Sequence, residues 1–104
     1  MLPLFPLKLA VLPKEILPLH IFEERYKKMI TESINTNSLF GMIYRVKGEF
    51  SKVGCAVKVY KILNKYEDGK YDILIEGCYR FKIINYMKKN DLWFADIKEI
   101  DEHY

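Results

Sequence analysis

The sequence predicts a mainly β fold of the α+β class, a small barrel of about six strands with one main α-helix near residues 22–35. Three observations predict it. All four prolines lie in the first 18 residues and forbid helix in a leucine-rich segment that would otherwise favour it. One segment of helical periodicity follows. The remaining residues form short apolar runs separated by turn signals, which is typical of small β-barrels.

The composition limits the class of protein. The 104 residues suffice for one domain, residues 1–104, and the content of 50% apolar and 30% charged residues is that of a globular chain. The apolar N-terminal segment, residues 1–21, which we call the leader, lacks a basic n-region, and this disfavours a signal peptide. No uninterrupted run of about 18 apolar residues occurs, which excludes a transmembrane helix. Cys55 and Cys78 lack C-x-x-C spacing, so we expect two reduced, buried thiols in a cytoplasmic protein.

The leader should form two extended segments, residues 2–8 and 15–21. Proline pushes the residue before it towards extended geometry and cannot donate to a strand ladder. Each segment is therefore expected to be an edge strand, or a strand whose prolines face away from the neighbour. The intervening "VLPKE" is expected to be a turn.

A helix is expected to begin at about Phe22 or Glu23. Its apolar stripe has helical spacing and consists of Phe22, Tyr26, Met29, Ile30, Ser33 and Ile34. The sequence "NTNS" should end it, with Asn35 or Asn37 in the left-handed conformation of a helix cap.

The rest of the chain is expected to be strand. The predicted strands are residues 39–46, 53–66, 70–77, 78–89 and 92–100, with "KGEFSK" as a loop. Asp68-Gly69 is a strong hairpin signal, and a two-residue turn there would place Lys61 opposite Glu76. One face of this hairpin would then be core, with the residues Tyr60, Ile62, Tyr66, Tyr71, Ile73 and Ile75.

Several motifs together resemble a known family. The ordered combination of "LPLFPL", "LPLHIFEERY", "VGCAVKVYKIL" and "EGCYRF" resembles the N-terminal, substrate-recognition domain of the Lon family of ATP-dependent proteases, over nearly the whole chain. The resemblance implies a PUA-like pseudo-barrel that recognises substrate polypeptide and supports self-association. No G-x-x-x-x-G-K-[ST] loop occurs. We therefore expect the β-rich lobe alone, in stand-alone form, without an ATPase, a peptidase or the family's helical lobe.

No catalytic, metal or cofactor site is expected. His20 lies near two glutamates, but the other histidine, His103, is at the chain's end, and a metal needs three or four converging ligands. Cys55 and Cys78 lie in apolar strand patterns, which disfavours an activated thiolate. The sequence thus predicts a protein that is not an enzyme.

A buried ion-pair network is expected to join the helix to the sheet. Arg80 lies among apolar strand residues and would need an anionic partner if it is buried. The candidate members are Glu23, Arg25, Glu76 and Arg80. A structural role is favoured over ligand binding.

The leader also holds more large apolar side chains than so small a core needs. Some should form an exposed groove for unfolded or degron-bearing polypeptides, aided by strand pairing at an open edge. The candidate contact residues are Leu4, Phe5, Leu7, Leu17, Leu19 and Met42. A second copy of the chain is the rival occupant, which would make a homodimer.

RNA binding is the alternative function. PUA-like folds occur in RNA-binding proteins, and basic and aromatic residues interleave in "YRFKIINYMKK". The mild net charge of +3 and the nearby acidic residues disfavour it. Small-molecule sensing by analogy with cereblon-like domains is weaker still, because Trp93 is the sole tryptophan.

Overall fold

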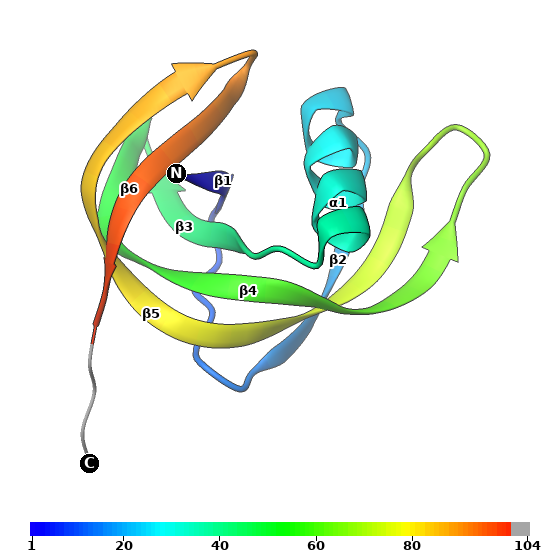
Figure 1. Cartoon of the computed structure of the whole chain (residues 1–104), viewed down its shortest axis with the longest axis horizontal. Coiled ribbons are helices and arrows are strands. Elements are labelled where there is room, and N and C mark those ends of the chain that lie inside the picture. The colour runs from blue at the N-terminus through cyan, green and yellow to red at the C-terminus, as the bar shows by residue number, and fades with distance from the viewer. Residues whose placement is uncertain (101–104) are drawn as a thin grey trace.

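The computed structural model describes residues 1–100, so the histidine at position 103 lies outside the described residues. The strands are β1 (Leu2–Leu7), β2 (Ile16–Ile21), β3 (Phe40–Val46), β4 (Glu49–Lys65), β5 (Tyr71–Lys89) and β6 (Leu92–Glu99), and the helix is α1 (Glu24–Thr36). Figure 1 shows the strongly curved sheet and the helix beside it. The predicted mainly β architecture with one helix is confirmed.

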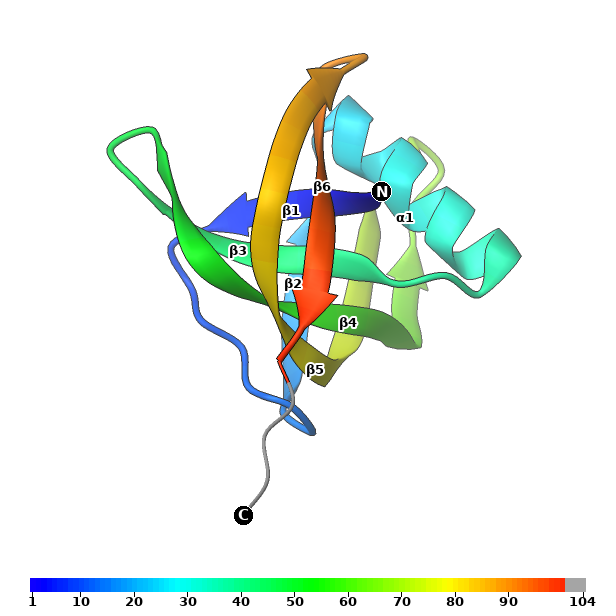
Figure 2. The same cartoon turned by 60° about the vertical axis from the view of Figure 1, so that its left-hand side comes forward.

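The sheet closes on itself because its longest strand, β5, pairs with three others. The strand order is β2-β5-β4-β3-β1-β6, and β5 also pairs with β6. Figure 2 shows β5 curving from its place beside β2 and β4 to its place beside β6. β2 lies at the edge of the sheet, as expected for a strand that contains a proline. β1 lies inside the sheet, parallel to β3 along residues 4–7 and antiparallel to β6 at residues 2 and 3.

Strands β4 and β5 are longer than the sequence predicted. The predicted loop "KGEFSK" is reduced to a turn at Lys47 and Gly48, which have φ angles of 53° and 81°, and β4 begins at Glu49. The two strands predicted between residues 70 and 89 are one strand, β5. The prediction placed a break between Gly77 and Cys78. The structure has a register shift there instead, because Ala56 of β4 pairs with Tyr79 and Val57 pairs with Gly77.

The predicted hairpin register is wrong. The turn is a three-residue loop, residues 67–69, because Tyr66 N donates to Lys70 O at 2.9 Å and Gly69 has a φ of 88°. Three bulges shift the pairing of β4 with β5, so Glu76 faces Lys58 instead of Lys61. An extra residue in one strand reverses which side chains face the core.

The predicted core face of this hairpin is therefore half correct. Tyr71, Ile73 and Ile75 on β5 are buried. The other residues predicted for this core face are exposed: Tyr60 by 53%, Ile62 by 41% and Tyr66 by 42%. The tip of the hairpin consequently carries apolar side chains on its surface.

The buried side chains form two clusters. The first lies under α1 and includes Tyr26, Met29 and Ile30 of the helix. The second lies inside the barrel and consists of Leu4, Ile43, Ala56, Phe81 and Ala95. The predicted helical stripe is thus confirmed from Tyr26 onward, whereas Phe22 is 57% exposed and that part of the prediction is wrong.

Helix α1 lies between two hairpins, as Figure 1 shows. Lys27 Nζ donates to Asp68 O at 2.8 Å in the β4–β5 turn, and Arg25 Nη1 donates to Asp91 O at 3.3 Å in the β5–β6 turn. Asn37 ends the helix with a φ of 51°, so of the two predicted caps Asn37 is the correct one. Within residues 1–100 no helix is long and apolar enough to cross a membrane.

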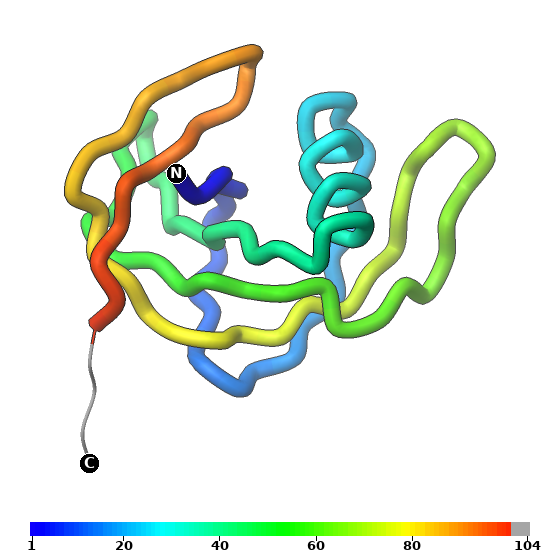
Figure 3. Tube along the Cα trace, in the orientation of Figure 1, coloured from blue at the N-terminus to red at the C-terminus, as the bar shows by residue number. Residues whose placement is uncertain are grey.

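Residues 8–15 link β1 to β2, and we call them the strap; the chain's path through it can be followed in Figure 3. Lys14 N donates to Gly77 O at 2.8 Å, and Gly77 N donates to Glu15 O at 2.9 Å. The predicted turn in "VLPKE" is confirmed by the hydrogen bond from Glu15 N to Leu12 O, at 3.1 Å. The strap is thereby fastened to β5.

Candidate functional site

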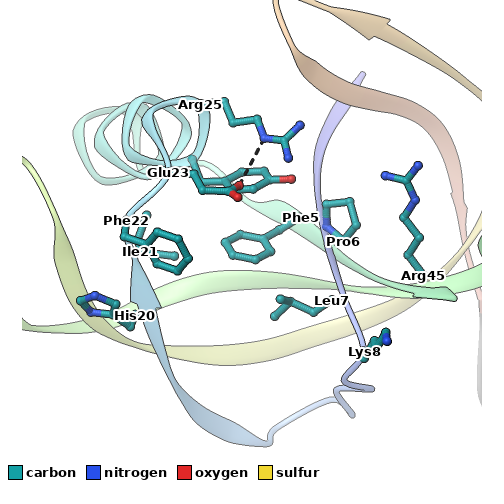
Figure 4. Close-up of a pocket in the computed structure, with 11 residues that line it drawn as sticks. Phe5, Pro6, Leu7, Lys8, His20, Ile21, Phe22, Glu23, Arg25 and Arg45 are labelled. Atoms are coloured by element: carbon teal, nitrogen blue, oxygen red, sulfur yellow. Dashed lines mark hydrogen bonds and ion pairs between the residues drawn. The ribbon is translucent and has the colours of Figure 1, made fainter. Parts of the chain in front are cut away.

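A groove of about 380 Å³ opens between the end of β1, the end of β2 and the first turn of α1. Figure 4 shows its lining, and we call it the β1–β2 groove. Its apolar lining residues are Phe5, Pro6, Leu7, Ile21, Phe22 and Tyr26. Its polar lining residues are Lys8, His20, Glu23, Arg25 and Arg45.

The floor of the groove is an extension of the core. The rings of Phe5 and Tyr26 stack with their centroids 4.4 Å apart and their planes 18° apart. Phe5 also lies 6.4 Å, centroid to centroid, from the fully buried ring of Phe40. The floor is therefore a stack of aromatic rings that already belongs to the first core cluster.

The mouth of the groove carries an exposed aromatic ring. Phe22 follows β2 and precedes Glu23, the N-cap of α1, and it is 57% exposed. The His20 ring lies 5.8 Å from it in a stacked arrangement. Phe22 lies outside the helix, so its side chain does not follow the helical stripe that buries Tyr26.

A carboxylate on β5 holds His20. The contact between His20 Nδ1 and Asp72 Oδ1 measures 2.6 Å, and the Tyr66 hydroxyl donates to Asp72 Oδ2. The Tyr66 hydrogen bond, followed by that of His20, holds the pKa of Asp72 below its usual range. Asp72 is therefore ionised at neutral pH and fixes the imidazole at the mouth of the groove.

The cations at the groove differ in their contacts. Arg25 Nε lies 3.4 Å from Glu23 Oε2, and the Arg25 guanidinium lies 4.7 Å above the Tyr26 ring. The Arg45 guanidinium lies 4.9 Å from the centroid of Phe50. Lys8 makes no ion pair with any residue of the described part of the chain.

Two of the predicted polypeptide-contacting residues line the groove, and two are corrected. Phe5 and Leu7 are lining residues. Leu4 is 0% exposed and Met42 is 2% exposed, so both belong to the core. Leu4 packs in the cluster inside the barrel, and Met42, which lies opposite Phe5 on β3, packs in the cluster under α1.

The other predicted contact residues, Leu17 and Leu19, are half-buried. They pack on the first core cluster from β2, and the groove lining includes neither. Sequence reasoning missed Phe22 and Arg45 as groove residues. The sequence did contain a signal for Phe22. It stands immediately before two glutamates, which are typical of a helix start, so its side chain need not follow the buried face of the helix.

The predicted four-residue ion-pair network is divided in the structure. Glu23 and Arg25 lie together at the groove, whereas Glu76 Oε1 pairs with Lys58 Nζ at 3.2 Å. The physical reason is the distance between Glu76 and the start of α1. Glu76 lies opposite Ile16, the first residue of β2, whereas α1 follows the end of β2. The six residues of β2 span about 17–20 Å. Arg80 lines a second cavity, beside the strap.

The two cysteines differ in burial, and neither thiol is activated. Burial raises the pKa of the Cys55 thiol to about 11, and burial also raises that of Cys78. Cys78 is nevertheless an exposed residue, so its predicted burial is wrong. It lies at the register shift of β5, between Gly77 and Tyr79. Among residues 1–100 no group of three His, Cys, Asp or Glu side chains could hold a metal.

Comparison with known proteins gives consistent results. A family model described as the ATP-dependent protease La (LON) substrate-binding domain matches residues 1–104. The chain is 24% identical over 110 aligned residues to a Lon protease of Flavobacterium johnsoniae, and equally to one of Anaeromyxobacter dehalogenans. Each alignment covers 97% of this chain and 13% of the relative, so the chain spans about one eighth of the length of these curated relatives.

Solved structures show the same fold. The crystal structure of a Lon N-terminal domain protein from Xanthomonas campestris superposes with a TM-score of 0.86 at 26% identity, covering 96% of this chain and 59% of that one. The N-terminal domain of the Mycobacterium avium complex Lon protease gives a TM-score of 0.75 at 16% identity, covering 99% of this chain and 56% of that one. The second likeness concerns the fold alone.

Proposed function

Because the chain belongs to the family of Lon substrate-binding domains, we propose that it is a non-catalytic module that holds polypeptide segments in the β1–β2 groove. The observation that carries this proposal is that the exposed Phe22 side chain lines the same groove as the buried stack of Phe5 and Tyr26. This apolar surface is continuous with the core and open at its mouth, as a site for an apolar side chain requires. The guests are unfolded or degron-bearing chains, which expose such side chains.

The edge of β2 is the second part of the proposed site. β2 pairs with β5 along residues 16–21, and its other edge ends the sheet. An extended polypeptide that paired with this edge would run towards the groove, because His20 and Ile21 at the end of β2 line it. Pro18 lies in the middle of the strand and removes one donor, which limits edge-to-edge aggregation.

Replacing Phe22 with serine tests this proposal. Full burial of a phenylalanine side chain is worth about 1.5–3 kcal/mol, so the F22S variant should bind an unfolded polypeptide about tenfold more weakly. The measurement is fluorescence anisotropy of a labelled, reduced and carboxymethylated protein titrated with each variant. Stability should change little, because the ring is 57% exposed.

Tyr60→Ser is the matched control, since Tyr60 is a similarly exposed aromatic residue on the β4–β5 hairpin. It should leave the affinity unchanged. Equal affinities for wild type and F22S, or a loss with the tyrosine variant alone, would place the site elsewhere on the molecule. Absence of saturable binding by the wild type would remove the proposed function.

Self-association through the same surface is the rival occupant. In that case wild type would sediment as a dimer and F22S as a monomer, and the groove would be closed to guests. The proposal includes a cytoplasmic setting, in which the free thiols of Cys55 and Cys78 remain reduced.

RNA binding is disfavoured because several lysine side chains form ion pairs with carboxylates of the protein itself. Lys27, Lys58 and Lys88 each form an ion pair with a carboxylate, at 2.8, 3.2 and 3.6 Å. Fewer cations are then available to neutralise phosphates. We expect no gel shift with a structured RNA at low ionic strength, and a salt-dependent shift would favour the RNA alternative.

A further inference from the structure

The charges of the β1–β2 groove are unevenly distributed. In Figure 4 the side chains of Arg45 and Lys8 lie on the side of the groove near Pro6, and those of Phe22, Ile21 and His20 lie on the opposite side, near β2. Arg25 extends from the helix between the two sides, beside Glu23. The groove thus has an apolar wall and a wall with a positively charged rim. A guest that fits both walls needs side chains of two kinds.

The positive rim is only partly neutralised. Arg25 contacts Glu23 at 3.4 Å and the Asp91 carboxylate at 3.7 Å. Arg45 and Lys8 have no carboxylate within ion-pair distance among residues 1–100. Three cations and one anion, Glu23, therefore line the groove. A carboxylate of a guest would complement this excess charge, and a lysine would be repelled by it.

We propose that the groove selects extended internal segments in which an acidic side chain lies two positions from an aromatic or large aliphatic one. The inference rests on the proposed function, polypeptide binding in this groove. In an extended chain, residues i and i+2 point to the same face, about 6.6 Å apart. One such pair would place the apolar side chain against Phe22 and the carboxylate towards the positively charged rim on the Pro6 side.

The expected selectivity is modest. One exposed ion pair changes a binding constant by about 1.4-fold to fivefold. Two rim cations should therefore favour the acidic segment over a neutral one by about twofold to 25-fold at low ionic strength. Added salt should reduce the preference, because the rim is open to solvent.

Blocked peptides with Phe-Ser-Glu, Phe-Ser-Gln or Phe-Ser-Lys at their centre test the inference. The acidic peptide should bind most tightly to the wild type and the lysine peptide least tightly. The Arg45→Gln/Lys8→Gln double variant should bind the acidic and glutamine peptides equally. The Lys61→Gln/Lys82→Gln double variant removes two exposed cations outside the groove and should retain the wild-type preference.

The outcomes separate this inference from the proposed function. Equal binding of the acidic and glutamine peptides to the wild type would overturn the inference and leave polypeptide binding intact. The same conclusion would follow if the Arg45→Gln/Lys8→Gln variant still bound the acidic peptide more tightly than the glutamine peptide. A gain seen only when the peptide's own C-terminal carboxylate is left free would show that chain ends, not internal acidic residues, are selected. No binding of any peptide or unfolded protein would overturn both.

Discussion

Replacing Phe81 with alanine should lower the free energy of unfolding by about 3–5 kcal/mol, the range for truncating a fully buried phenylalanine. Phe81 is 0% exposed and belongs to the cluster inside the barrel. A Cβ atom added at Gly54 would lie 2.6 Å from the Phe81 ring, and one at Gly41 would lie 3.0 Å from it. The ring therefore fills the space beside two glycines, which have no side chains to occupy the cavity that its loss would leave.

Urea unfolding followed by tryptophan fluorescence measures this loss, because the single tryptophan, Trp93, packs on the same cluster. Phe22→Ala is the matched control, since it makes the same chemical change at a 57% exposed position. It should cost about 0.5 kcal/mol or less. Similar losses for the two variants would contradict the assignment of Phe81 to a closed barrel core.

Gly77→Ala is expected to destabilise the protein by about 1–3 kcal/mol, the usual cost of forcing an extra carbon atom into packed structure. A Cβ atom on Gly77 would lie 2.2 Å from Leu12 O and 2.9 Å from Leu12 C. Both are backbone atoms of the strap, so relief requires movement of the strap, which Gly77 itself holds by two hydrogen bonds. The variant should thus loosen the strap as well as lower stability.

Chemical denaturation gives the stability change, and limited proteolysis within residues 8–15 reports the strap. Cys78→Ala is the control, because it alters the neighbouring, exposed side chain without adding an atom. Faster cleavage is expected for Gly77→Ala only. Wild-type stability in Gly77→Ala would mean that the strap does not pack on β5 as described.

The fold was largely predictable because local signals agree with it. The prolines of the leader prevent helix, and the apolar spacing from Tyr26 onward matches the face of α1 that is buried. Asn37 has both the residue type and the position that a helix end requires. The class, the helix and most strands follow from such signals.

The pairing of β4 with β5 was not predictable in the same way. Three bulges shift its register, and a bulge depends on neighbouring strands and on turn geometry more than on the residues of one strand. The loop at Gly69 contains three residues rather than two, which already moves Glu76 away from Lys61. The exposure of Tyr60 follows from that shift.

The groove was predictable only in part. Its apolar floor comes from the leader, as the surplus of leucine and phenylalanine indicated, and Phe5 and Leu7 are part of it. Its mouth and rim come from Phe22, Arg25 and Arg45, which lie before, within and after the helix. Only the folded chain brings these side chains together, because β3 pairs with β1 in parallel and carries Arg45 to the end of β1.

The most direct test of polypeptide binding in the β1–β2 groove is an NMR titration of the isotope-labelled protein with an unlabelled unfolded polypeptide. Backbone amide shifts should change at residues 5, 7, 8 and 20–25 and at Arg45, with smaller changes along the edge of β2. The signals of Tyr60 and Ile62 should stay in place. Changes confined to the β4–β5 hairpin, with the groove unaffected, would contradict the account.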